Sequence, residues 1–333
     1  MLTDKRSKFV RTAMQVGGYA LAIGLLAASL WYAMQGQNIE DWWHLLQAKP
    51  WLTTGLFATV ALSGVIVPGI LFWLVTRPFV SGRPLSMASM QSLAAGGGLL
   101  NYTPFKAGLI GRITYLKIFH GVGYKAAALT HAVIAAVFGA TCLLTILVTI
   151  WRGNFDIIWW VTSLLGLIII AAIAAPILRI MIPSEITVAP HLRGSTGGLF
   201  VYLMPCFITQ LFGLYITAIR WWLVFYILDK PISLADAWMA AIIHMVAITA
   251  GPANGIGLRE WLIGIGGQLG GLNSSLDIDM RVSMSAALID RAVEATVLIT
   301  LGLLGLAFLR YVTRRATNSN IDTEQPQAAD SSH

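Results

Sequence analysis

The chain alternates between long runs of apolar residues and short polar segments that hold most of its charge. A helix needs about 20 predominantly apolar residues to cross a bilayer, and several runs reach that length. The pattern therefore predicts six membrane-spanning helices. Their expected ranges are 12–34, 52–76, 125–150, 157–182, 198–228 and 284–310.

Two further apolar segments, 86–118 and 236–270, are interrupted by glycine and proline. The first lies between a predicted span that runs inward and one that runs outward, and the second lies between spans of the reverse directions. They are therefore expected to be re-entrant segments that dip into the membrane from opposite faces, as in an inverted repeat. Non-helical backbone at membrane depth persists only where protein covers it or water reaches it, so residues 96–112 should line a cavity. The alternative is an ordinary kinked helix packed between its neighbours.

Composition supports a membrane protein. The sequence is 57% hydrophobic and only 11% charged, whereas soluble proteins carry about 25% charged residues. The expected fold class is an all-α polytopic membrane protein with a single transmembrane domain over residues 1–315. Its two halves, about 12–182 and 198–312, are separated by a polar linker, and the polar tail 316–333 is expected to be disordered.

The distribution of charge predicts the orientation. The net charge is +7, and the cations gather in short segments between the spans, which favours a topology signal over nucleic-acid binding. If the N-terminus is cytoplasmic, the outer loops hold only Lys49, Arg152, Lys230 and Arg281, as the positive-inside rule requires. Both termini are then cytoplasmic. The tryptophans expected to form an outer interfacial belt are Trp31, Trp42, Trp43, Trp51, Trp151, Trp159 and Trp160.

The first broken segment carries residues that suit an anion. Pro104 fits the first turn of a half-helix, whose unpaired N–H groups and partial positive charge would face the cavity. Lys106 and Arg112 would add charge there and could bind a phosphate. The alternative is that both are ordinary inside-positive residues.

Several charges also fall in the second broken segment and in the last span. Arg259 and Glu260 lie just beyond the second break, where they could form a salt bridge or contact a substrate. Asp290, Arg291 and Glu294 share the last span, and each charge at the centre of a lipid-facing helix costs about 2.5–3.5 kcal/mol. They therefore need partners or a wet interior, and Arg259 is the natural cross-partner for an acid here.

Other groups allow further interpretations. His131 and His244 could relay protons or could simply be satisfied by a neighbouring helix. Glu40 and Asp41 could be the acidic loop residues of a glycosyltransferase that uses lipid-linked sugars, or a solvated loop end. The sequence has no HExxH, P-loop, GxSxG or CxxC motif, so neither a cofactor nor a metal is expected.

Three blocks, "NYTPFKAGLIGRITYLK", "GPANGIGLREWLI" and "LIDRAVEATVLITLGLLG", occur in the order and spacing of a known family. They resemble the lysylphosphatidylglycerol synthetase-like transmembrane family of flippase-like proteins, over most of residues 10–312. The resemblance implies re-entrant helices that move modified phospholipids or other polar lipids between leaflets. The matching residues are Asn101, Pro104, Gly108, Arg112, Pro252, Gly255, Gly257, Arg259, Glu260 and Arg291.

The sequence departs from that family in two ways. Ala253 and Asn254 stand where the family has its first glycine, and the soluble aminoacyl-transferase domain of the full-length synthetases is absent, so the chain is not expected to attach lysine to lipid. The expected function is translocation of a polar lipid headgroup across the bacterial inner membrane, with phospholipid, polyprenyl-linked or hopanoid-type lipids as partners. The alternatives are a membrane transferase acting on lipid-linked substrates and a non-catalytic partner of a lipid-biosynthetic complex.

Overall fold

The computed structural model describes residues 17, 20–35, 39–102, 107–190, 192–250, 255–268 and 279–324. These residues form helices and connecting loops, with no strand among them. Five helical stretches are long and apolar enough to cross a membrane, which makes the chain an all-α, membrane-embedded protein. They are Pro50–Phe79, Tyr124–Arg152, Ile157–Met181, Thr196–Ile227 and Met280–Arg314.

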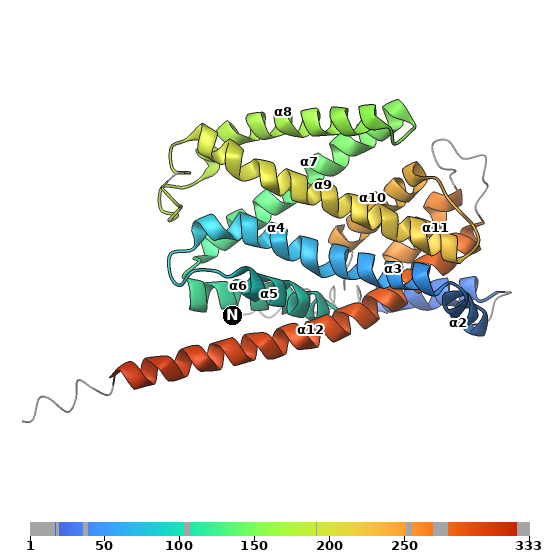
Figure 1. Cartoon of the computed structure of the whole chain (residues 1–333), viewed down its shortest axis with the longest axis horizontal. Coiled ribbons are helices and arrows are strands. Elements are labelled where there is room, and N and C mark those ends of the chain that lie inside the picture. Colours follow the sequence, from blue (N-terminus) through green and yellow to red (C-terminus); the bar gives the residue numbers. More distant parts are fainter. Residues whose placement is uncertain are drawn as a thin grey trace, which may run out of the picture.

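These five stretches match five of the six predicted spans. The remaining prediction, 12–34, is described only in part, as the shorter apolar helix Ala20–Ala33. The long helices pack in layers (Figure 1): α8 (Ile157–Met181) lies on α9 (Thr196–Ile227), which covers α3 (Pro50–Ala61) and α4 (Val67–Thr76). The remaining helices of the described chain are α2 (Ile39–Ala48), α5 (Met87–Leu100), α6 (Ala107–His120), α7 (Tyr124–Arg152), α10 (Leu234–Ala250), α11 (Leu258–Gln268) and α12 (Met280–Glu324).

The stretch from α3 to α4 contains a π-helical turn, Leu62–Ile66, just before Pro68. A proline within a helix lacks the N–H that the preceding turn needs, and a widened turn accommodates this loss. The Ile66 carbonyl, two residues before Pro68, accepts a hydrogen bond from Gln91 Nε2 of α5 at 2.9 Å. The irregular turn therefore faces the first broken segment.

The first broken segment is a helical hairpin. Its two ends meet, because the Gly82 N–H donates to the His120 carbonyl at 3.0 Å and Ser81 Oγ donates to the Gly121 carbonyl at 2.8 Å. Near the tip α6 crosses α5 so closely that a Cβ on Gly108 would lie 2.0 Å from the Gly97 carbonyl oxygen. Only glycine fits this crossing.

The second broken segment consists of α10 and α11. The turn that joins these two helices includes Gly255 and Gly257, with φ of +73° and +77°. Glycine adopts such left-handed backbone without strain. A Cβ on Gly257 would also lie 2.5 Å from the Ala22 carbonyl oxygen, so the turn packs directly on the helix Ala20–Ala33. From there α11 runs back beside the start of α12, where a Cβ on Gly264 would be 2.9 Å from the Met284 side chain.

The two broken segments open at opposite ends of the bundle. The first begins just after α4, at Ser81 and Gly82. The second begins beside the start of α3, where Lys49 Nζ binds Asp229 at 2.5 Å. About 30 residues of helix separate these two points, which corresponds to roughly 45 Å at 1.5 Å per residue.

The exposure of the tryptophans corrects the predicted interfacial belt at two positions. Trp31, Trp43, Trp51 and Trp151 are between 61% and 71% exposed, as expected for a lipid-facing position. Trp159, however, is fully buried and packs edge-on against Trp238 with ring centroids 4.9 Å apart.

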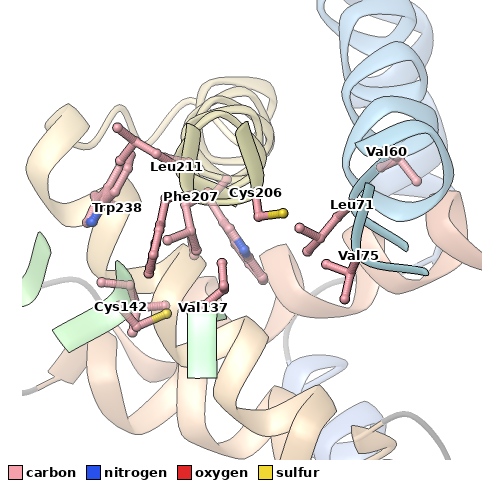
Figure 2. Close-up of a cluster of buried hydrophobic side chains, with 14 of the residues drawn as sticks. Val60, Leu71, Val75, Val137, Cys142, Cys206, Phe207, Leu211 and Trp238 are labelled. Carbon is pink, nitrogen blue, oxygen red and sulfur yellow. The ribbon is translucent and has the colours of Figure 1, made fainter. Parts of the chain in front are cut away.

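Trp42 is also buried, so the interfacial belt was a wrong prediction for Trp42 and Trp159. Tryptophan near a span end can face either lipid or a neighbouring helix, and the sequence position does not distinguish the two. The buried core holds both cysteines, Cys142 and Cys206, with Phe207, Leu211 and Trp238 (Figure 2).

The two helix ends on either side of the loop between α7 and α8 are both capped. Gly153 ends α7 in the left-handed conformation, with φ of 66°. Asp156 caps α8 by accepting a hydrogen bond from the Trp159 N–H at 2.9 Å. The hydrogen bond from the Arg152 guanidinium, together with this cap, lowers the pKa of Asp156.

Candidate functional site: a buried ion network beside a cavity

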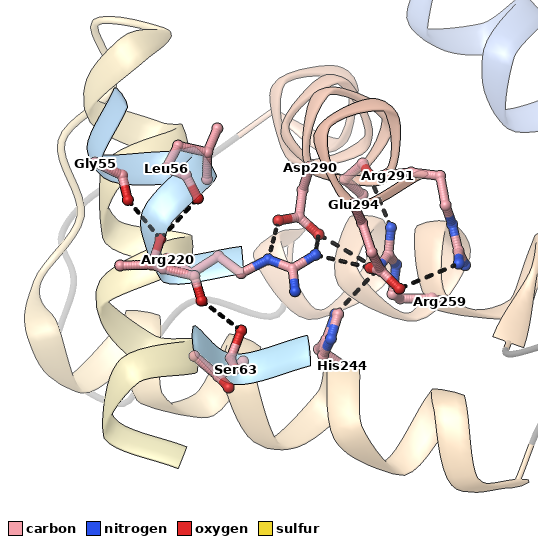
Figure 3. A network of polar contacts seen from close by, with 12 residues as sticks. Gly55, Leu56, Ser63, Arg220, His244, Arg259, Asp290, Arg291 and Glu294 are labelled. Atoms are coloured by element: carbon pink, nitrogen blue, oxygen red, sulfur yellow. Dashed lines mark hydrogen bonds and ion pairs between the residues drawn. The ribbon is translucent and has the colours of Figure 1, made fainter. Parts of the chain in front are cut away.

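Three arginines and three carboxylates meet inside the bundle, close to where the two broken segments approach each other. Figure 3 shows the three arginines beside Asp290 and Glu294. Each of the six residues is at most 8% exposed. They are Arg220 on α9, Arg259 and Glu260 on α11, and Asp290, Arg291 and Glu294 on α12.

The contacts centre on Glu294. Its Oε2 accepts hydrogen bonds from Arg220 Nη2 at 2.7 Å and from Arg259 Nη1 at 2.6 Å. Arg220 also pairs with Asp290, through Nε and through Nη2 at 2.6 Å from Oδ2. The pairing of Arg259 with an acid on the last span confirms the expected cross-contact.

Tyr102 joins the tip of the first hairpin to this network. Its hydroxyl donates to Glu294 Oε1 at 3.0 Å and accepts from Arg291 Nη1 at 3.1 Å. Arg291 Nε in turn lies 3.0 Å from Glu260 Oε1 at the start of α11. The hairpin α5–α6 and the pair α10–α11 are thus connected through one set of hydrogen bonds.

The network is electrically balanced. Three guanidinium groups face three carboxylates, and a buried charge persists only when it is paired and hydrogen-bonded. Each of its arginines therefore pairs with at least one carboxylate of the set, while Arg259 Nε and Glu260 Oε2 make no hydrogen bond among the described residues. Arg259 and Arg291 are not among the residues that line the neighbouring cavity, whereas Arg220 and Glu294 are.

The cavity has a volume of about 420 Å³, within the range of small-molecule sites. It lies between the π-helical turn and α4 on one side, the first hairpin on another, and α7, α9, α10 and α12. Most of its lining is apolar or glycine. The polar residues that line it are Ser63, Asn101, Arg112, His131, Gln210, Thr217, Arg220, His244, Thr249 and Glu294.

Arg112 is the cation in this cavity that lacks a carboxylate partner within the described part of the chain. Its Nη2 lies 2.5 Å from His131 Nε2, and its guanidinium carbon lies 3.7 Å from the centre of the Phe72 ring. Gly108 sets this position, because it lets α6 approach α5 and Arg112 follows one helical turn later. The cavity therefore carries one positive charge that the surrounding described residues leave without a counter-charge.

Asn101 lies at the end of α5 and also lines the cavity. Its Oδ1 is buried and has no hydrogen-bond partner among the residues described. The buried Gln210 of α9 contributes a second amide to the lining of the cavity. These amides lie in the same cavity as Arg112 and could hydrogen-bond a polar ligand.

The predicted site residues fall into three groups. Asn101, Gly108, Arg112, Asp290, Arg291, Glu294, Arg259 and Glu260 belong to the cavity or to the adjoining network. Gly255 and Gly257 shape the second turn and do not line the cavity. Pro104, Lys106 and Pro252 lie outside the described residues.

Sequence reasoning assigned no role to three residues that matter here. Arg220 is a charge within an apolar run, so the cost argument applied to the last span could have singled it out. Tyr102 and Gln210 carry no such signal, because either residue is common at a helix end or interface. Glu40 and Asp41 begin α2 and do not line the cavity.

No metal-binding group of three or more His, Cys, Asp or Glu side chains occurs among the described residues. Comparisons of the chain with protein-family models, with curated proteins and with solved structures found no match in any of the three. The assignment of function must therefore come from the site itself.

Proposed function

We propose that this chain translocates a polar or modified lipid headgroup across the bacterial inner membrane. The observation that carries the proposal is a cavity of about 420 Å³ in which Arg112 has no carboxylate partner among the described residues. A half-buried, uncompensated cation is costly, and an anionic ligand would relieve that cost. Every common phospholipid and polyprenyl-phosphate headgroup supplies such an anion.

In this proposal the two broken segments are re-entrant hairpins that enter from opposite faces, and both termini are cytoplasmic. The positions of the hairpin ends support it, since one hairpin opens after α4 and the other beside the start of α3. Cations gather near the cytoplasmic ends so defined, which agrees with the positive-inside rule.

The cavity walls suggest how a headgroup could be held. The phosphate would contact Arg112, with the amides of Asn101 and Gln210 available as further partners. The lipid tails would stay in the bilayer, so the protein need only solvate the headgroup. The balanced network would fix the tips of both hairpins, with Arg259 and Arg291 acting as positioning residues. The resemblance to flippase-like proteins agrees with this assignment.

The test is reconstitution into vesicles with headgroup-labelled anionic, aminoacylated and polyprenyl-linked lipids, followed by leaflet accessibility. Arg112→Gln should slow translocation about tenfold or more, since a charge-assisted hydrogen bond contributes about 1.5–3 kcal/mol. Lys117→Gln is the matched control, because Lys117 is an exposed cation of the same helix that lies over the Tyr124 ring. It should translocate as the wild type does.

Folded wild-type protein that moves none of these lipids would overturn the proposal. Loss of a transferase activity on substituting Glu40 or Asp41 would instead favour an enzyme acting on lipid-linked substrates. Equal rates for Arg112→Gln and wild type would remove the cavity from the transport route.

A further inference from the structure

His131 is held in a single neutral form. Its Nδ1 lies 2.8 Å from the Ala127 carbonyl oxygen, which can only accept a hydrogen bond, so Nδ1 carries the proton. Its Nε2 lies 2.5 Å from Arg112 Nη2, which can only donate, so Nε2 presents a lone pair. A proton on Nε2 would face a donor and a positive charge.

The charges around His131 make this constraint strong. Of the helices packed against α7, α4 carries no titratable side chain, and Arg179 of α8 bonds Thr196 at the helix end. Within the cavity, the other charged or titratable groups that the structure describes are Arg112, Arg220, His244 and Glu294. On α7 itself, Lys125 near the helix start pairs with Glu185.

Within the ion network, the charges of Arg220 and Glu294 are already balanced by partners. Each is bonded within a set of three arginines and three carboxylates, and His244 Nδ1 lies 3.3 Å from Arg259 Nη1 of that set. The site formed by Arg112 and His131 therefore has a net charge of one positive unit while His131 is neutral.

We propose that the Arg112–His131 pair is a selective phosphate site that takes phosphodiester headgroups without a proton, and takes phosphomonoester headgroups only together with a proton on His131. This inference rests on the proposed function and names its substrate class. One guanidinium balances the single negative charge of a phosphodiester. A phosphomonoester carries about two negative charges above its second pKa of about 6, so the half-buried site needs a second positive charge to balance it.

The geometry explains how His131 can take up the additional proton on Nε2. A phosphate oxygen placed between Arg112 and His131 would separate the two groups and accept from both. The proton taken up from solvent then sits on Nε2 and is donated to that oxygen, while Nδ1–H keeps its bond to Ala127. No covalent bond of the ligand forms or breaks.

Titration calorimetry on the detergent-solubilised full chain tests this inference. The probes are dihexanoyl phosphatidylglycerol, a phosphodiester, and dihexanoyl phosphatidic acid, a phosphomonoester, each at about pH 8 in two buffers of different ionisation enthalpy. Glycerophosphoglycerol and inorganic phosphate serve as tail-free probes, so that a lipid site can be told from a free-phosphate site.

Phosphatidylglycerol should bind with no proton uptake, and phosphatidic acid should bind more weakly with uptake of about one proton. His131→Gln keeps a neutral hydrogen-bonding side chain, so it should retain phosphatidylglycerol binding and abolish the uptake with phosphatidic acid. Arg112→Gln should weaken both lipids about tenfold or more, whereas Lys117→Gln should change neither.

Proton uptake that persists in His131→Gln would place the proton on the ligand or elsewhere and overturn the inference. Tighter binding of inorganic phosphate than of either lipid would do the same, because it would make this a free-phosphate site. Lipid binding with the expected proton count, but without translocation in vesicles, would leave this inference standing and remove the proposed transport.

Discussion

Glu294→Gln is the sharpest test of the buried network. The Glu294 carboxylate accepts from Arg220, Arg259 and Tyr102 at 2.6–3.0 Å, so it joins residues of α9, of α11 and of the first hairpin. The substitution leaves three guanidinium groups facing two carboxylates, and it places an amide N–H₂ against an arginine. Removing one partner of a buried ion pair costs about 3–5 kcal/mol, so we expect a loss of that size in the free energy of unfolding.

Glu185→Gln supplies a matched control, because it is the same substitution in an exposed pair. Lys125 and Glu185 are 73% and 68% exposed, and such pairs contribute about 0–1 kcal/mol. Both variants would be unfolded by titration with sodium dodecyl sulfate in mixed micelles and followed by tryptophan fluorescence. If Glu294→Gln lost no more stability than Glu185→Gln, the reasoning from the buried network would be refuted.

A charge-balanced pair of substitutions distinguishes the effect of an unpaired charge on stability from the effect of a changed side-chain shape. Arg220→Met and Asp290→Leu each leave the network with one unpaired charge, whereas the double variant removes both members of a bonded pair. Because the remaining two arginines and two carboxylates are again balanced, the double variant should lose less stability than the two single variants summed, when measured by the same titration. Additive losses would show that the residues act independently.

Three further predictions concern the hairpin, a loop and the topology. Gly108→Ala should lower unfolding stability by about 1–3 kcal/mol, since an added Cβ would lie 2.0 Å from a carbonyl oxygen of α5. Gly111→Ala, whose Cβ would meet nothing within 4 Å, should be neutral or stabilising in the same titration. Asp156 has a lowered pKa in the folded protein, so its contribution is present above the unfolded pKa of about 3.9 and is lost as pH falls through the folded value. Asp156→Asn should therefore flatten the fall in stability measured at acidic pH, and an unchanged profile would contradict this. Cysteine placed at the exposed positions Ser81 and Lys230 should be labelled by an impermeant maleimide on intact cells only at Lys230, and labelling at both would contradict the proposed orientation.

Much of the fold follows from the apolar pattern. Five stretches of that pattern match helices of spanning length, and both interruptions fall between helices. The interruptions could be predicted from the sequence because they contain glycines that the structure requires. Gly255 and Gly257 adopt left-handed backbone, and Gly108 permits a helix crossing that a Cβ would block. The pattern does not show which side of a helix packs against a neighbour, which is why Trp159 was wrongly expected in the interfacial belt.

The candidate site was predictable only to the level of residue type. The cost of charge within a membrane marks Arg112, Arg259 and Arg291 equally, because the cost depends on the charge and not on the partner. Whether a partner exists depends on which helices meet, and that is a property of packing. The structure separates them: Arg259 and Arg291 face carboxylates, and Arg112 faces a histidine and a phenylalanine ring.

The ion network and Arg112 are therefore suited to different roles. A balanced network gains little from an anion, because a further negative charge would have to displace a carboxylate that is already paired with an arginine. It is suited to fix the tips of two hairpins that approach from opposite ends. Arg112 has the opposite property, since within the described chain its charge is met only by the lone pair of His131 and the face of Phe72, both weaker partners than a carboxylate. Under the proposed function, an anion entering the cavity would therefore improve the electrostatics at Arg112 without disturbing the contacts that connect the two hairpins.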